Sequence, residues 1–151
     1  MRVSELTDLA LDWAVAKCEG GDCLWYDTIA THWMTLNGKD IALSKGWAQS
    51  FTPSTNWEHG GPIIERERIA MSSKPDGLWA AYAPKGTRLV QHGGQAVEIF
   101  NWYFKQEGYT PLVAAMRCYV ASKLGDEVEI PAELLTKEKF NKEEPTLTHR
   151  R

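Results

Sequence analysis

The sequence lacks the long apolar runs and the strong charge excess that mark two broad classes of protein. No run approaches the roughly 20 apolar residues of a membrane-spanning helix, and the opening MRVSELTDL contains no apolar core of a signal peptide. The formal net charge is −3, and the Lys and Arg residues are scattered instead of forming a basic stripe. We therefore expect a cytoplasmic protein whose partner is neither a membrane nor a nucleic acid.

Cysteine and histidine are too few and too dispersed to predict a metal site. The three cysteines are Cys18, Cys23 and Cys118, and only the first two lie close together, with four residues between them. No second Cys/His pair follows at the spacing of a zinc site, and His32 and His92 are isolated. We expect free thiols in a reducing compartment, with no bound metal and no cofactor.

Recognisable catalytic motifs are missing as well. The sequence contains no G-x-S-x-G elbow, no H-E-x-x-H pair and neither of the common glycine-rich phosphate motifs. Glu58-His59 is a neighbouring acid–base pair, but adjacent side chains diverge on a helix and do not serve one site easily. Cys118 falls inside a predicted helix, where a buried apolar role is several times more common than catalysis. We therefore assign no catalytic residue.

Aromatic residues, by contrast, are abundant. The chain has 151 residues, which suits one domain, and seven of them are tryptophan. Most of these indoles are expected in the core, where their large apolar faces pack. A core of this size does not need seven tryptophans, so we expect one or two of them to line a pocket or an interface.

Apolar spacing predicts an α+β fold, a compact sandwich of helices packed on a small antiparallel sheet. Helices are expected over about 4–19, 61–69 and 111–124, and strands over 70–73 and 78–82 with a turn at 74–77. Weaker signals predict strands near 24–26, 41–43 and 87–91, a strand or a short helix over 95–106, and a tight hairpin turn at Asn37-Gly38. Asp8 and Asp12 are expected on the solvated face of the first helix.

The domain organisation is expected to be simple. Residues 1–136 are predicted to form a single α+β domain, and residues 137–151 a flexible charged tail. The part from about 85 to 107 reads as an insertion whose aromatic cluster must bury against something. A pocket shared across a homodimer suits a chain of this length.

The segment before the second predicted helix carries more capping residues and glycines than a helix start requires. Ser54, Thr55 and Asn56 can each accept a hydrogen bond from free N–H groups. Gly60 and Gly61 allow a ligand to approach the backbone. Because a helix N-terminus offers unpaired N–H groups and the positive end of the helix dipole, this segment is a candidate phosphate site. A capped helix start without any ligand explains the same residues equally well.

Three further side chains would complete a nucleotide pocket. Trp57 and Tyr103 each offer a ring that can stack on a base, which contributes roughly 1–3 kcal/mol. Arg117 borders the apolar stripe of the last helix, and a guanidinium binds phosphate through two parallel hydrogen bonds. The structural alternatives are a hydrophobic staple for Trp57 and a salt bridge to Glu65 or Glu127 for Arg117.

Two long stretches, FTPSTNWEHGGPIIERERI and YTPLVAAMRCYVASKLGDEVEIP, resemble the NinX-type proteins of bacteriophages and prophages. The opening MRVSELTDLALDWAVAKCEG fits the same family, so that the resemblance covers somewhat over half of the chain. Residues 85–107 extend beyond the usual connection of the family. The resemblance implies a compact α+β sandwich and a phage gene product that acts in the cytoplasm of an infected bacterium. It implies no catalytic motif.

The leading hypothesis is a non-enzymatic phage protein that binds a small nucleotide-like ligand. By analogy with small phage proteins that sequester bacterial immune signals, the ligand would be an ADP-ribose derivative of the Thoeris type. The segment 54–61 would take phosphate, Arg117 would neutralise it, and Trp57 or Tyr103 would stack on the base. The alternatives are an inhibitor of a host enzyme that acts through residues 85–107, and a nucleotide phosphodiesterase.

Overall fold

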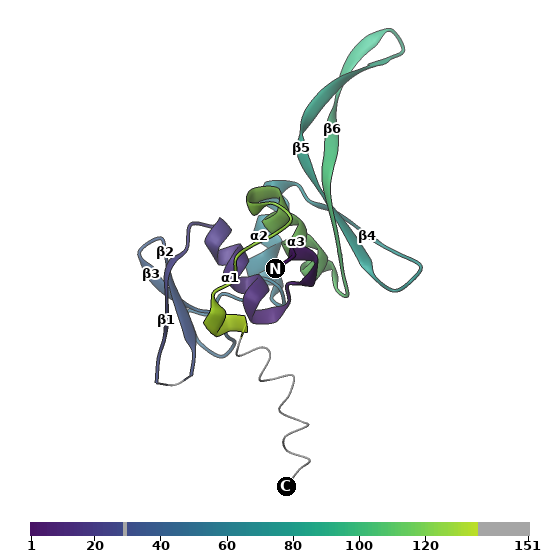
Figure 1. The fold of residues 1–151 in the computed structure, drawn as a ribbon. Helices are drawn as coiled ribbons and strands as arrows, with labels where there is room; N and C mark the ends of the chain where they lie inside the picture. Colours follow the sequence, from purple (N-terminus) through teal and green to yellow (C-terminus); the bar gives the residue numbers. More distant parts are fainter. Residues whose placement is uncertain (29, 136–151) are drawn as a thin grey trace.

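The computed structural model describes residues 1–28 and 30–135, apart from the side chains of Trp102 and Tyr103. The helical elements are η1 (Val3–Glu5), α1 (Asp8–Cys18), α2 (Trp57–Glu67) and α3 (Pro111–Leu124). One antiparallel sheet has the order β1 (Asp22–Tyr26), β2 (His32–Leu36), β3 (Lys39–Ala42). The other has the order β4 (Ala70–Ser73), β5 (Trp79–His92), β6 (Gln95–Gly108). The predicted α+β class is confirmed, with two small sheets in place of one (Figure 1).

Helix α3 occupies the centre of the fold because it is apolar on nearly every side. Thr110 caps its start through an Oγ1 that accepts a hydrogen bond from the Val113 N–H at 3.1 Å, and Pro111 fills the first helical position. Nine of its residues are buried, so the helix must lie between other elements. It packs against β5 and β6 on one side and against α1 and α2 on the other (Figure 1).

Two glycines permit close packing around α3. A Cβ added at Gly108 would lie 2.7 Å from the backbone nitrogen of Ala114. A Cβ added at Gly60 would lie 2.6 Å from Leu112 Cδ2 and 2.7 Å from the carbonyl oxygen of Pro53. Both positions therefore require glycine. Gly60 is buried, and Leu112 and Pro53 lie against its Cα, so this glycine has a packing role in the fold.

The first two helices begin where the sequence did not predict. Helix α1 starts at Asp8, after the short η1 turn, so Ser4 is not its cap. Helix α2 starts at Trp57 because the Asn56 side chain accepts a hydrogen bond from the Glu58 N–H at 2.9 Å. Pro62 lies inside α2, where its missing N–H leaves the Glu58 carbonyl without its usual helical partner.

Both predicted tight turns are present. Asn37 and Gly38 have φ values of +53° and +77°, the paired left-handed conformation of a type I′ turn between β2 and β3. Gly77 has a φ of +88°, and its N–H donates to the Lys74 carbonyl at 3.1 Å in the turn between β4 and β5. These two turns are set by residues within a few positions of each other, which explains why the sequence alone predicts them.

The segment 95–106, which the sequence assigned to a strand or a helix, belongs to strand β6. Strands β5 and β6 pair from Trp79 with Gly108 to His92 with Gln95. Beyond a pairing irregularity at Pro84, the two strands leave the body of the protein as a projecting ribbon (Figure 1). Side chains at 85–89 and 91–98 are exposed. The predicted insertion is therefore an outward hairpin, not a part of the compact body.

Two further expectations concern the ends of the chain and the membrane. The predicted tail, residues 137–151, lies outside the residues that the structure describes. Among the described residues, no helix has both the length and the apolar character needed to cross a bilayer.

Candidate functional site

A cavity of about 280 Å³ lies between α1, the sheet β1–β2–β3 and the loop that precedes α2. Its polar walls combine two carboxyl groups, an imidazole, an ammonium and several hydroxyls, and these come from Asp8, Asp12, Thr31, His32, Ser44, Lys45, Thr52 and Thr55. Thr55 is the one residue of the predicted phosphate segment that lines this cavity. Such convergence of polar groups in a concave space is typical of ligand sites.

Asp12 is the most unusual side chain in the cavity, because it is a carboxyl group that is only 4% exposed. Its Oδ1 accepts a hydrogen bond from the Ser54 N–H at 2.8 Å. Burial raises the pKa of Asp12 to about 7, against the opposing influence of the bond from Ser54 and of the nearby Lys45. A carboxyl group that titrates near neutrality inside a cavity is a frequent feature of functional sites.

The prediction that Asp12 is solvated is wrong, and the sequence contained a signal against it. Between Leu9 and Ala16, Asp12 is the only polar residue, so the helix has no continuous polar face on which to expose it. Every residue from Ala10 to Ala16 is buried. A single carboxylate surrounded by apolar neighbours on a helix therefore indicates a buried polar contact.

Ser54 supports this carboxyl group and is itself only 1% exposed. Its N–H is committed to Asp12. Its Oγ adjoins the same carboxyl group but makes no hydrogen bond of acceptable geometry with the described residues. Because the neighbouring group is an acid, an anionic phosphate here would face repulsion whenever Asp12 is ionised. The surroundings of Ser54 thus favour a hydrogen-bond donor over a phosphate.

The N–H groups of the predicted phosphate segment are largely used by the loop itself. Those of Thr55 and Asn56 donate to the Thr52 carbonyl at 3.1 and 2.9 Å. Those of His59 and Gly60 donate to the Asn56 carbonyl at 3.1 and 2.9 Å. The Thr52 N–H in turn donates to Nδ1 of His59 at 2.9 Å, which closes the loop. An anion at the start of α2 would have to compete with these bonds.

The other predicted site residues do not converge with Thr55. Trp57 is 52% exposed at the first position of α2. A Cβ added at Gly61 would meet nothing within 4 Å, so this position is open but has no wall opposite it. Tyr103 belongs to strand β6, and its side chain lies outside the described residues. Of the predicted residues whose side chains the structure describes, Thr55 and Arg117 line different cavities.

Arg117 holds the fold together instead of pairing with a carboxylate. It is 7% exposed, and its Nε donates to the Leu6 carbonyl at 2.9 Å. Its Nη1 donates to the Glu107 carbonyl at 2.7 Å. Glu65 and Glu127 are both described residues and neither pairs with it, so the alternative of a salt bridge to them is wrong. The guanidinium lines a different cleft from that of Asp12.

The sequence did not predict a site role for an exposed tyrosine that contacts His32, a residue of the cavity wall. Tyr26 is 55% exposed, and the centre of its ring lies 4.7 Å from that of His32 in an edge-on arrangement. On the same sheet, the rings of Trp25 and Trp33 are stacked with their centres 6.4 Å apart, and Trp47 meets Trp33 edge-on at 5.1 Å. Cross-strand pairing places Trp25 opposite Trp33 and Tyr26 opposite His32, which spacing within one strand does not reveal.

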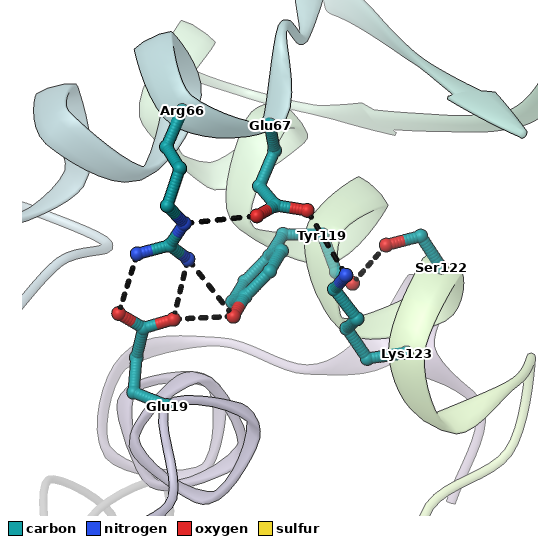
Figure 2. Close-up of polar contacts among 6 residues, drawn as sticks. All are labelled: Glu19, Arg66, Glu67, Tyr119, Ser122 and Lys123. Atoms are coloured by element: carbon teal, nitrogen blue, oxygen red, sulfur yellow. Dashed lines mark hydrogen bonds and ion pairs between the residues drawn. The ribbon is translucent and has the colours of Figure 1, made fainter. Parts of the chain in front are cut away.

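A separate ionic cluster joins the three long helices (Figure 2). Arg66 of α2 donates two parallel hydrogen bonds to Glu19 at 3.0 and 2.6 Å and one to Glu67 at 2.9 Å. Lys123 of α3 pairs with Glu67 at 3.1 Å, and the Tyr119 hydroxyl donates to Glu19. Burial opposes ionisation of Glu19, but the bonds from Arg66 and Tyr119 outweigh it and hold its pKa below the ordinary value. These charges satisfy one another, so the cluster is a structural clamp.

Comparison with known proteins adds one finding. A protein-family model described as "Bacteriophage P22, NinX" matches residues 2–123, which is most of the chain and includes residues 85–107. No curated protein matches the chain.

Proposed function

Because the chain belongs to the NinX family of bacteriophage proteins, we propose that it acts in the cytoplasm of the infected bacterium and binds a small nucleotide-like ligand without turning it over. The observation that supports this proposal is the buried Asp12 carboxyl group in a cavity of about 280 Å³. This volume lies near the lower end of the range for small-molecule sites, and we assign the cavity to the nucleoside part of the ligand.

Because burial raises the pKa of Asp12 to about 7, this group is mostly ionised above that pH and then selects hydrogen-bond donors on the ligand. An ionised carboxylate only accepts hydrogen bonds, and ribose hydroxyls or the amino group of a base supply the donors. The hydroxyls of Thr31, Thr52 and Thr55 add groups that can donate or accept at the remaining positions of the sugar. This assignment differs from the sequence hypothesis, in which the same loop would hold phosphate.

The rim of the cavity supplies the groups for the rest of a nucleotide. Lys45 is exposed and lines the cavity, and we assign to its ammonium the phosphate attached to the nucleoside. The exposed ring of Tyr26, beside His32, is the candidate for stacking on the base, in place of Trp57 and Tyr103.

We assign to the ligand the class of ADP-ribose derivatives that serve as bacterial immune signals. Such a molecule carries ribose hydroxyls for Asp12, phosphates for Lys45 and a base for Tyr26. A phage protein that holds this signal without turnover keeps it from its bacterial receptor, and sequestration is then the biological outcome.

Titration calorimetry with adenosine, AMP, ADP-ribose and cyclic ADP-ribose tests the proposal. At least one ADP-ribose form should bind more tightly than adenosine. Asp12→Asn should weaken that binding about tenfold or more, because the new amide donor faces a donor of the ligand. Asp40→Asn makes the same change at an exposed position of β3 and should bind like the wild type. Failure of all four compounds to bind at millimolar concentration would refute the proposal.

The phosphodiesterase alternative is separated from sequestration by recovery of the ligand. After prolonged incubation with the protein, mass spectrometry should find the bound ADP-ribose form intact. More moles of hydrolysed product than of protein would establish turnover, provided that Asp12→Asn abolishes it and Asp40→Asn does not. That result would contradict the non-enzymatic function.

One observation favours a second function, the inhibition of a host enzyme. Leu89 is 71% and Val97 is 38% exposed on the projecting ribbon. Two-stranded ribbons are marginally stable in water on their own, so a partner that covers this one would stabilise it. Stoichiometric capture of one host protein by the wild type, lost in Leu89→Ser and kept in Leu124→Ser, is the result that this function requires.

A further inference from the structure

A second and larger cleft, of about 560 Å³, lies beside η1, at the bases of β5 and β6 and against α3. Its walls include Ser4, Leu78, Lys105, Tyr109 and Arg117. It shares no residue with the cavity at Asp12, so what it binds is independent of the proposed nucleoside site.

Arg117 brings a buried positive charge to the wall of this cleft without a carboxylate partner among the described residues. Two of its nitrogens donate to the carbonyls of Leu6 and Glu107, and these neutral acceptors do not cancel the charge. The third nitrogen, Nη2, hydrogen-bonds to none of the described residues. Burial lowers the pKa of Arg117, which reflects the cost of holding this cation away from water.

Glu107 is the one carboxylate among the described residues that line the cleft, and it is engaged by other cations. Its Oε2 lies 2.6 Å from Nζ of Lys74 and 3.6 Å from Nζ of Lys105. The group that Arg117 contacts is the backbone carbonyl of Glu107. Lys74 also pairs with Asp76 at 3.1 Å, so the three cations Lys74, Lys105 and Arg117 face two carboxylates, which leaves an excess of one positive charge at the cleft.

We propose that this cleft binds the phosphate group of a small molecule. The guanidinium of Arg117 and the ammonium of Lys105 supply N–H donors and an excess of positive charge, which suit an anionic phosphate. Ser4 and Tyr109 also line the cleft and add hydroxyl donors. The volume of about 560 Å³ exceeds that of a bare phosphate and leaves room for the organic part of a phosphorylated metabolite.

Inorganic phosphate and pyrophosphate are the probes for this site, with binding followed by calorimetry of the full-length protein. Saturable binding of both is expected in the millimolar range or tighter, and Lys105→Gln should weaken it about fivefold or more. Tyr109→Phe should weaken it about twofold, since this exposed side chain loses only a hydroxyl. Lys39→Gln removes an exposed lysine from β3 and should leave binding unchanged.

Arg117→Gln also removes two structural hydrogen bonds and is expected to destabilise the protein. The phosphate site is therefore tested with Lys105→Gln and Tyr109→Phe. Absence of saturable binding at about 20 mM phosphate, or binding that neither variant weakens, would overturn the proposal. Acetate that binds as tightly as phosphate would overturn the assignment to phosphate. The nucleoside site is tested with adenosine and the ADP-ribose forms, and this cleft with phosphate and pyrophosphate at Lys105 and Tyr109, so failure of one site is read separately from failure of the other.

Discussion

Replacing Asp12 by asparagine should change the free energy of unfolding, relative to the wild type, more favourably at pH 8 than at pH 5. Burial raises the pKa of Asp12 in the folded protein from its ordinary value of 3.8 to about 7. A group whose pKa is higher in the folded state contributes stability that is complete below about pH 3.8, declines as the pH rises, and is lost above about pH 7. Asparagine does not titrate, so the variant is free of this loss.

The magnitude follows from the two pKa values. Their separation corresponds to roughly 4 kcal/mol over the whole titration, of which about 2.5 kcal/mol falls between pH 5 and pH 8. Asparagine keeps a side-chain oxygen that can accept the hydrogen bond from the Ser54 N–H, which is 2.8 Å from the carboxylate in the wild type. The contact with the loop is therefore retained while the titrating charge is removed.

Urea denaturation at pH 5, 6.5 and 8, followed by tryptophan fluorescence, measures this effect in the wild type and in the Asp12→Asn and Asp40→Asn variants. The quantity to compare is the difference in unfolding free energy between Asp12→Asn and the wild type, because titrations of other groups cancel in it. This difference should move in favour of the variant by about 2.5 kcal/mol from pH 5 to pH 8. A difference that stays constant over this range refutes the reasoning, and the same holds if Asp40→Asn reproduces the change.

Three other substitutions test the packing and the polar clamp in the same denaturation assay. Glu19→Gln should lower the free energy of unfolding by about 1 kcal/mol at pH 7. Because the pKa of Glu19 is lowered in the folded protein, its contribution to stability is lost as the pH falls, and the variant should lose less stability than the wild type below about pH 4.5. Equal acid sensitivity in variant and wild type would contradict this. Gly108→Ala should cost about 2–3 kcal/mol because its Cβ meets the Ala114 backbone, and a neutral result would show that β6 can shift. Gly61→Ala should raise the free energy of unfolding by about 0.5–1 kcal/mol, since the position is helical and a Cβ there meets nothing within 4 Å. A lower free energy of unfolding would contradict this open position.

The parts of the fold that the sequence predicts are those decided by local chemistry. Thr110 caps α3 and Asn37-Gly38 forms a hairpin turn because each involves partners no more than three residues away. The course of residues 85–107 could not be predicted in the same way. A projecting ribbon and a buried strand can share one pattern of β-forming residues, and packing against the rest of the protein decides between them.

The candidate site was less predictable for a related reason. The capping residues of the segment 54–61 looked like a surplus, yet the loop uses most of them, as Asn56 caps α2 and Gly60 packs against Leu112. Local polar groups have local partners within reach, so their number alone does not indicate a ligand.

A charged residue inside an apolar helical run is the more informative signal in this chain. Asp12 stands alone among the apolar residues of α1, and Arg117 is the only charged residue between Leu112 and Ala121 in α3. The helix backbone satisfies itself and cannot neutralise such a charge, so burial forces each side chain to find partners on other elements. Asp12 finds the Ser54 N–H, Arg117 finds two carbonyls, and each keeps part of its hydrogen-bonding capacity at the wall of a cavity or cleft. Both proposed binding sites follow from this incomplete compensation, and the pH dependence of Asp12→Asn measures the cost of burying the charge of Asp12.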